Sequence, residues 1–265
     1  MRNVRMQIAY DGSEFFGWQR QAGFETVQET LEAALLAATG EDVVVQGSGR
    51  TDTGVHALRQ VGNCHIATAL EDDSLRHAVN AHLPASIVVG RLETCADDFH
   101  ARFSACGKRY LYLTATSRFR PPVGQRYAAW SHFVLDFPAM RQAAEALIGE
   151  HDFSGLSKAA PERKSSVRRV RSLRWIRHRK SLAFVIEADG FLYNMVRAIA
   201  GTLFEVGRGR LSPEVVARAL ADGDRSRVGA TAAAGGLYLL RVRYDEPLFR
   251  GRDRGPRGVP GAFDY

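Results

Sequence analysis

Gly49-Arg50-Thr51-Asp52-Thr53-Gly54-Val55-His56 is the stretch from which the rest of the chain can be interpreted. It lies between two apolar runs, Val43–Val45 and Val61–Ile66, which we expect to be strands. The two glycines let the backbone turn sharply and leave room for a ligand. Arg50 stands two residues before Asp52 and favours its ionised form. Asp52 is therefore a candidate reactive carboxylate, although an ordinary Asp-Gly turn has the same composition.

Composition indicates a globular protein. The chain has 265 residues, 45% of them hydrophobic and 25% charged, which suggests two domains or one large one. No apolar run has membrane-spanning length, and a strand pattern follows Met1 without a signal peptide, so we expect a cytoplasmic protein. Cys64, Cys95 and Cys106 are widely spaced, and the histidines show no metal-ligand spacing. We therefore expect neither a disulfide framework nor a metal site.

The positive charge is clustered. The net charge is +7, and Arg163–Lys180 holds nine Lys or Arg residues without an acid. Ala101–Tyr127 holds six more, again without an acid, and the C-terminal tail adds four arginines. Such runs are usually solvated faces, but two acid-free blocks interleaved with aromatic residues suit RNA better than duplex DNA, because unpaired bases can stack. The candidate RNA contacts are Arg168, Arg169, Arg171, Lys108 and Arg109.

The first half of the chain predicts a mixture of strands and helices. Val4, Met6, Ile8 and Tyr10 alternate with other residues as in a half-buried strand. Thr26 and Glu29 form a capping box, from which a helix should run to about Thr39 and end at Gly40. The other expected elements are strands over 43–46, 61–66 and 87–92 and a helix over 74–81.

The second half repeats this order without a sequence repeat. We expect strands over 109–114, 170–176, 182–187 and 237–244, a helix starting at Asp136, an apolar helix over 191–206 closed by Gly207, and a helix capped by Ser212-Pro213. Strands and helices do not alternate regularly, which favours an α+β fold with antiparallel pairing. The predicted domains are 1–105, 106–245 and a basic tail, 246–265.

Further blocks of sequence stand in a recognisable order. They are Tyr10-Asp11-Gly12-Ser13, Gly17-Trp18-Gln19-Arg20-Gln21, Thr26-Val27-Gln28-Glu29, Asn80-Ala81-His82-Leu83-Pro84, Asp97-Asp98-Phe99-His100-Ala101-Arg102-Phe103-Ser104-Ala105, Lys108-Arg109-Tyr110-Leu111-Tyr112, Asn194-Met195-Val196-Arg197 and Gly236-Leu237-Tyr238-Leu239. With these blocks and the Asp52 loop, the chain resembles the TruA family of tRNA pseudouridine synthases from Tyr10 to Tyr244. Thr53 is a small departure, since the family often has Ala or Gly there.

The resemblance implies a fold and a reaction. The fold would have two similar halves, with mainly antiparallel sheets flanked by helices and an active-site cleft between them. The reaction would convert uridine to pseudouridine at positions 38 to 40 of the tRNA anticodon stem-loop, by breaking the N1–C1′ bond and rejoining the base through C5. An isomerisation needs no redox or energy cofactor, and no nucleotide-binding motif is present. A paired target must leave the helix, so base flipping is expected. The family also implies a homodimer.

Residue roles follow from the same resemblance. The catalytic aspartate falls on Asp52, which could act as a nucleophile or as a base. Tyr110 would lie on the uracil face with its hydroxyl placed to move the C5 proton, or it is only a half-buried strand aromatic. Arg50 would support the vacated base stack or a phosphate, or only stabilise the turn as an ion pair. Arg197 would pair with Asp52, or it extends from a helix edge into solvent.

Other functions are compatible with parts of the sequence. Asp52-Thr53-Gly54 matches the triplet of aspartic proteases, but that chemistry needs two carboxylates that share a proton, and one copy is present. A basic RNA-binding protein without catalysis would explain the charge but not the Arg50–Asp52 turn. A pseudouridine synthase acting at another tRNA position is the third alternative.

Overall fold

The computed structural model describes residues 1–159 and 164–249. The described residues form two compact units, the first made of Met1–Cys106 together with residues 238–249, and the second of the described residues within Gly107–Leu237. We expected residues 238–245 in the second half, whereas here they pack with the N-terminal half. Most of the basic tail, including its four arginines, lies outside the described residues.

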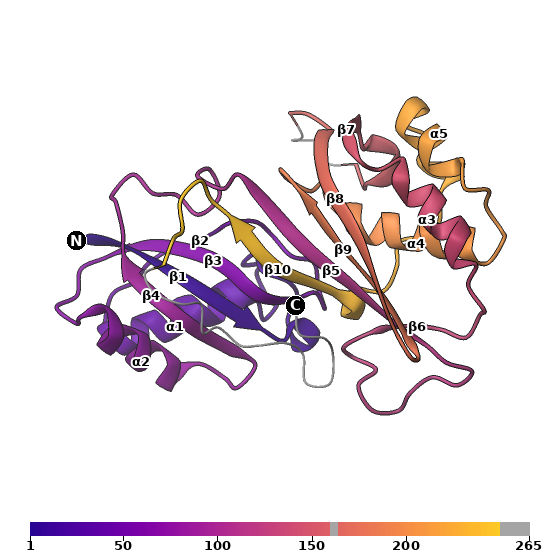
Figure 1. The fold of residues 1–265 in the computed structure, drawn as a ribbon. Helices are drawn as coiled ribbons and strands as arrows, with labels where there is room; N and C mark the ends of the chain where they lie inside the picture. The colour runs from indigo at the N-terminus through magenta and orange to yellow at the C-terminus, as the bar shows by residue number, and fades with distance from the viewer. Residues whose placement is uncertain (160–163, 250–265) are drawn as a thin grey trace. The chain divides into compact units, whose positions relative to one another are not determined.

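Unit 1 is built on a sheet of four main strands in the order β4-β1-β3-β10 (Figure 1). They are β4 (Ile87–Thr94), β1 (Arg2–Tyr10), β3 (His56–Ile66) and β10 (Leu237–Arg243), with the short β2 (Gln46–Gly47) paired to β3. The first three are antiparallel neighbours, and β10 runs parallel to β3. The helices α1 (Val27–Thr39) and α2 (Asp72–His82) pack together beside this sheet, and η1 (Gly12–Glu14) is a single 3-10 turn.

Unit 2 has a sheet in the order β5-β9-β8-β7. Its strands are β5 (Gly107–Thr116), β9 (Ser181–Ala188), β8 (Val167–His178) and β7 (Gly149–Asp152), all antiparallel to their neighbours, and β6 (Ala129–Ser131) runs parallel to β5. The helices α3 (Phe137–Glu145), α4 (Met195–Gly207) and α5 (Val215–Asp222) pack against one face of the sheet (Figure 1). Three 3-10 turns complete the unit: η2 (Ser154–Leu156), η3 (Arg225–Arg227) and η4 (Ala234–Gly236).

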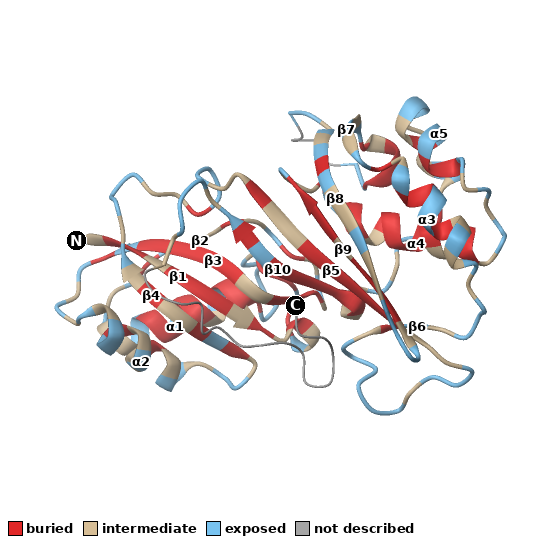
Figure 2. Cartoon of the chain, viewed as in Figure 1, coloured by how far each residue is buried: buried red, intermediate tan, exposed pale blue. Residues whose placement is uncertain are grey.

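The predicted α+β class, with mainly antiparallel sheets flanked by helices, is confirmed in each unit. Figure 2 shows the burial that drives this arrangement, with buried residues concentrated in the central strands and on the inner sides of the helices. In β1 the alternating residues Val4, Met6 and Ile8 are fully buried, as their spacing predicts. Among the described helices, none has the length and apolar character needed to span a bilayer.

The helix α1 begins and ends where the sequence predicts. The Thr26 hydroxyl accepts a hydrogen bond from the backbone N–H of Glu29 at 3.4 Å, which satisfies one of the unpaired donors of the first turn. Gly40 follows the last turn in the left-handed conformation, with φ 76°, and its N–H donates to Leu36 O. These signals act within a few residues, so they can be interpreted from the sequence alone.

The strand predicted over 43–46 is wrong apart from Gln46. Val45 is buried, but its backbone groups pair with side chains of α1 instead of a neighbouring strand. Its N–H donates to Glu32 Oε1 at 2.8 Å, and its carbonyl accepts from Gln28 Nε2 at 3.2 Å. The apolar pattern correctly indicated burial, but it could not indicate which groups would take the backbone hydrogen bonds.

Two helix starts are also placed differently. The helix predicted from Phe191 begins at Met195, because Asn194 has a φ of 60° and Leu192 O accepts from Met195 N in a preceding turn. The following helix begins at Val215, with Glu214 and not Ser212 at its N-cap. Ser212 contributes through its backbone, since its carbonyl accepts from Val215 N at 3.1 Å.

Candidate active site

The loop that carries Asp52 connects β2 to β3 and is anchored through Thr51. The Thr51 hydroxyl lies 2.8 Å from the Tyr10 hydroxyl, and its carbonyl accepts from Trp18 N at 3.1 Å. Thr51 is buried, whereas Arg50 is exposed and Asp52 is half-buried. The buried residue therefore fixes the backbone, and the two charged side chains on either side of it are presented at the surface.

Burial also keeps the Tyr10 hydroxyl, which holds Thr51, in its protonated form. Desolvation raises the pKa of Tyr10 far above its ordinary value, and hydrogen bonds from Thr51 and Gln60 oppose this only in part. The Tyr10 hydroxyl therefore stays protonated at all ordinary pH values and holds Thr51 as a neutral hydrogen-bonding group.

Gln60, in β3, supports the start of the loop. This side chain is fully buried. Its Nε2 donates to Gly49 O at 2.9 Å, and its Oε1 accepts from the Ser48 hydroxyl at 2.5 Å and from Val61 N at 3.2 Å. The amide thus uses both of its ends to hold the entry to the loop, and we did not predict this role from the sequence.

The end of the loop is closed by a turn. Val55 N donates to Asp52 O at 3.1 Å, and Gly54 has a φ of 78°, which a residue with a Cβ rarely adopts. Next, His56 Nδ1 accepts from Gly12 N at 3.1 Å. The His56 ring is buried and stacks on Tyr238 of β10 with a centroid separation of 4.7 Å.

Two glycines of the preceding segment lie directly on the loop backbone. A Cβ on Gly17 would meet Thr51 O at 2.5 Å and the carbonyl carbon of Asp52 at 3.2 Å. A Cβ on Gly12 would meet Val55 O at 2.0 Å. Only glycine allows this backbone-to-backbone approach. The sequence blocks that contain these glycines were recognised, but their contact with the Asp52 loop was not predicted.

Arg50 is turned toward the same segment. Its Nε donates to Gln19 Oε1 at 3.1 Å. This places the guanidinium beside the residue that follows Trp18, the segment on which the loop is anchored.

Tyr110 and Arg197 belong to unit 2. Tyr110 lies in β5, is buried, and meets the Phe191 ring edge-on at 5.0 Å. Arg197 lies in the first turn of α4, where its Nε donates to Ala232 O at 2.8 Å and its Nη1 to Asn194 Oδ1 at 3.1 Å. These contacts hold the Arg197 guanidinium at a fixed place in its unit.

Tyr112 is the neighbour that the sequence places on the same side of β5 as Tyr110. Its hydroxyl donates to Ala233 O at 2.9 Å, and its ring stacks on Phe184. Burial raises the pKa of Tyr112 well above its ordinary value, and the nearby charge of Arg197 opposes that rise. Tyr112 therefore serves the core of unit 2 as a neutral hydroxyl.

The basic residues predicted to contact RNA are less uniform than the sequence suggests. Arg109 donates from Nε and Nη2 to Glu187 Oε2 across the sheet, at 2.9 and 2.5 Å. Arg169 donates to Glu150 Oε2 at 3.3 and 3.2 Å. The acids come from neighbouring strands, so an acid-free run in the sequence does not remain acid-free in the sheet.

The remaining members of this set are placed as follows. Arg168 Nη1 donates to the carbonyls of Ser165 and Val167. Arg171 is exposed at a register shift in β8, and Lys108 is half-buried in β5. Arg163, the first residue of the basic block, lies outside the described residues. Within the described part of the chain, no group of His, Cys, Asp and Glu side chains is arranged to hold a metal ion.

The site can supply a carboxylate on a loop whose backbone is held from three sides. Such a group can act as a nucleophile toward carbon or as a general base. A fixed backbone lowers the entropic cost of bringing the carboxylate to the reacting atom. Arg50, on the same loop, offers a planar cation to a phosphate or a base.

Comparisons with known proteins identify relatives that match most of the chain. A family model described as tRNA pseudouridine synthase matches residues 6–104 and 143–245, which include Asp52 and Arg197 but not Tyr110. The tRNA pseudouridine synthase A proteins of Acetivibrio thermocellus and Thermoanaerobacter sp. are each 42% identical over 244 residues, covering 92% of this chain and 100% of each relative. A protein named tRNA pseudouridine synthase A 2, from Clostridium perfringens, is 38% identical over 245 residues and covers 92% of this chain and 100% of the relative.

A comparison of structures gives a weaker likeness. The solved structure titled "Structure of H/ACA RNP bound to a substrate RNA containing 2'-deoxyuridine" is 14% identical and covers 89% of this chain and 47% of that chain, with a TM-score of 0.39.

The close packing of Gly17 on the loop gives a direct test. Gly17 and Gly23 both have positive φ, at 89° and 81°, but a Cβ on Gly23 would meet nothing within 4 Å. Gly17→Ala should therefore destabilise the protein by about 1–3 kcal/mol more than Gly23→Ala, because it adds a clash to the same backbone strain. Urea denaturation of both variants measures the difference. Equal losses of stability would show that the loop backbone moves to admit a Cβ at position 17 without loss of stability, which would contradict this prediction.

Proposed function

The chain belongs to the tRNA pseudouridine synthase family, and we propose that it converts uridine to pseudouridine in the anticodon stem-loop of tRNA, at positions 38, 39 and 40. The enzyme is an isomerase. The reaction breaks the N-glycosidic bond, rotates the base and rejoins it through carbon, so substrate and product have the same atoms. The observation that carries the proposal is Asp52, a carboxylate held on a backbone-anchored loop in a chain 42% identical to named synthases.

The other functions considered from the sequence explain less. A protease function explains neither the basic composition nor the match to the tRNA pseudouridine synthase family. A binding protein without catalysis leaves unexplained why Tyr10, Trp18 and Gln60 hold one short loop so firmly. Action at another tRNA position would use the same chemistry, so the position of the product in the tRNA distinguishes it.

We assign Asp52 as the catalytic residue, acting as a nucleophile or as a base. The fixed Thr51 supports this role, since it holds the backbone from which the adjacent carboxylate extends. Arg50 is proposed to occupy the space of the flipped base or to bind an adjacent phosphate, and its exposure and planar cation suit both roles.

Tyr110 is proposed to contact the uracil and to move the C5 proton through its hydroxyl. Its rigid packing against Phe191 supports this role, because a ring that stacks on a base must itself be held. Arg197 is proposed as a substrate-binding residue, supported by the two hydrogen bonds that fix its guanidinium.

The basic residues of β5 and β8 are proposed to follow the RNA backbone. The support is their positive charge within one sheet, reduced at Arg109 and Arg169 by Glu187 and Glu150. Phosphate contacts position an RNA without reading its sequence. This surface would therefore contribute affinity, and the loop around Asp52 would select the uridine.

We also propose a cytoplasmic homodimer. Apolar side chains between β5 and α3 support a second copy, since Phe119, Val123 and Val134 are 75, 87 and 96% exposed. Sedimentation equilibrium measures the mass of the particle directly, and a monomer at micromolar concentration would contradict this proposal.

The first prediction concerns Asp52→Asn, which keeps the shape of the side chain but removes the carboxylate. The rate of tritium release from tRNA labelled at uridine C5 should fall by at least about 10³-fold. Binding of tRNA should change little, because phosphate contacts supply most of the affinity. Asp42→Asn, at a carboxylate of the same unit that is exposed at the surface, is the control and should have the wild-type rate. Turnover by Asp52→Asn would remove the catalytic assignment.

The second prediction separates two neighbouring tyrosines. Tyr110→Phe should lower the rate at saturating tRNA by about 10²-fold with little change in binding, because the ring remains and the proton carrier is removed. Tyr112→Phe removes the bond to Ala233 and should cost about 1 kcal/mol of stability while leaving the rate unchanged. The opposite pattern would assign the proton transfer to Tyr112.

The third prediction concerns the salt dependence of tRNA binding. Replacing Arg168, Arg169 and Arg171 by Ala should make the slope of log affinity against log salt shallower by about 0.7–0.9 for each phosphate that the protein no longer binds. Arg168→Ala alone should change the slope more than Arg169→Ala, since Arg168 donates to backbone carbonyls whereas Glu150 pairs with Arg169. The choice of uridine should stay the same. Superimposable slopes for the triple variant and the wild type would exclude β8 from the RNA surface.

A further inference from the structure

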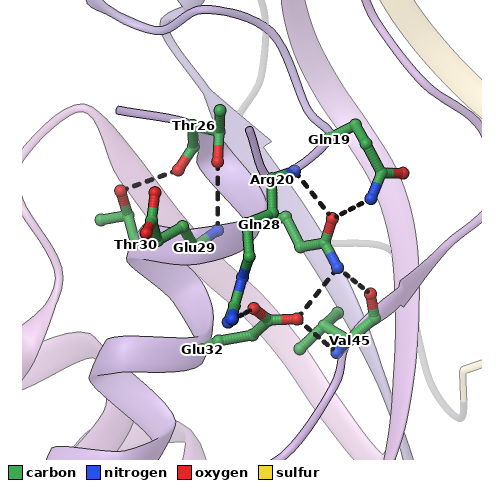
Figure 3. A network of polar contacts seen from close by, with 8 residues as sticks. All are labelled: Gln19, Arg20, Thr26, Gln28, Glu29, Thr30, Glu32 and Val45. Atoms are coloured by element: carbon green, nitrogen blue, oxygen red, sulfur yellow. Dashed lines mark hydrogen bonds and ion pairs between the residues drawn. The ribbon is translucent and has the colours of Figure 1, made fainter. Parts of the chain in front are cut away.

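A row of polar side chains leads from the interior of α1 to the Asp52 loop. Figure 3 shows its inner part, where Glu32, Gln28 and Gln19 are joined by hydrogen bonds beside Val45 and Arg20. We propose that Gln28 and Gln19 are positioning residues that hold the Arg50 guanidinium in one orientation on the loop that also carries Asp52. This inference rests on the proposed function, because it assigns a role to these residues in that reaction.

The row begins at a buried carboxylate. Glu32 is 3% exposed, and its Oε1 accepts from Val45 N at 2.8 Å and from Gln28 Nε2 at 3.0 Å. Its other oxygen pairs with Arg20. A carboxylate offers acceptors and no donors, so it requires Gln28 to turn its NH₂ group inward.

Gln28 carries this orientation outward. With its NH₂ group bound to Glu32 and to Val45 O, its carbonyl oxygen must point toward the surface. There Gln28 Oε1 accepts from Gln19 Nε2 at 2.9 Å and from Arg20 N at 3.0 Å. A reversed amide would place NH₂ against the Arg20 N–H, so both ends of Gln28 demand the same orientation.

Gln19 is the last amide in the row of hydrogen bonds and connects Gln28 to Arg50. Because its NH₂ group donates to Gln28, its Oε1 faces outward and accepts from Arg50 Nε at 3.1 Å. The buried charge of Glu32 thus ensures that Arg50 meets an acceptor at this point. With the amides reversed, an N–H would face the guanidinium and repel it.

Holding the Nε of an arginine has a specific consequence. The guanidinium is planar, so one hydrogen bond at Nε restricts its plane, while the terminal Nη groups stay directed away from that partner. Arg50 is exposed and has many rotamers without such a bond. A preset orientation reduces the ordering that is needed when the cation meets a base or a phosphate.

A structural role for the same network is separable from this one. The bonds from Glu32 and Gln28 to Val45 already attach the 43–45 segment to α1. The Gln19–Arg50 bond lies beyond them at the surface and is not required for that attachment. Gln19→Met removes both bonds of the Gln19 amide, to Arg50 and to Gln28. It leaves the buried pair of Gln28 and Glu32 intact, and Arg20 N still donates to Gln28 Oε1.

The experiment is a double-mutant cycle of Gln19→Met and Arg50→Ala. Single-turnover tritium release at saturating tRNA should fall about 10-fold in Gln19→Met and at least as much in Arg50→Ala, and the double variant should match Arg50→Ala alone. The unfolding midpoint of Gln19→Met should stay at the wild-type value. The matched control is Gln21→Met, an exposed glutamine that donates to Phe16 O, and it should have the wild-type rate.

A second readout does not depend on turnover. NMR measures the solvent exchange of the Arg50 Nε proton, which should be slow in the wild type and fast in both Gln19→Met and Gln28→Met. Unchanged exchange in either variant would overturn the inference even if the enzyme were inactive on tRNA. A double variant whose rate falls by the product of the two single decreases would also overturn it, because the two residues would then act independently. A wild-type rate in Gln19→Met, together with a lowered rate in Arg50→Ala, would overturn it as well. A wild-type protein that releases no tritium would instead refute the proposed function.

Discussion

The burial of Thr51 is the constraint on which the Asp52 loop depends. Its side chain is held by Tyr10 and its carbonyl by Trp18, so a buried residue separates the exposed Arg50 from Asp52. Holding Thr51 in place therefore fixes the backbone from which the side chains of its two neighbours extend. The glycine at 17 is required by the same constraint, because the Thr51 carbonyl occupies the space of its Cβ.

The segment that leads into the loop is held against α1 by hydrogen bonds from helix side chains, and not by pairing with a strand. Val45 pairs with Glu32 and Gln28, which places the connection before the loop against the helix and not in the sheet. The two side chains satisfy backbone groups that would otherwise be buried without partners. They also fix the orientation of Gln19, so the route of the chain into the loop and the surface around Arg50 depend on the same carboxylate. A change at Glu32 would affect both.

The sequence predicted well what is decided locally. The alternation of β1 and the caps of α1 depend on residues within a few positions, and the structure confirms both. It predicted poorly what depends on distant partners. Val45 is paired by helix side chains, and the acids beside Arg109 and Arg169 come from other strands. Asp52 is predicted from its turn and the family resemblance, and its role stays a prediction. The contacts of Gln60 and Gly17 with the loop could not be predicted, because they are set by the fold.

The polar residues buried in unit 1 indicate why such a costly arrangement persists. Six of them either touch or belong to the loop segment 48–56, or take part in the row of hydrogen bonds that ends at Arg50: Gln28, Glu32, Ser48, Thr51, His56 and Gln60. Apolar residues of the same size could fill this space without the cost of burying polar groups. They would give close packing, but packing does not distinguish a donor from an acceptor. Hydrogen bonds do, because each partner fixes which end of an amide or carboxylate faces it. The Asp52 loop carries a carboxylate and a guanidinium on one short segment, and the buried polar groups around it supply that directional information.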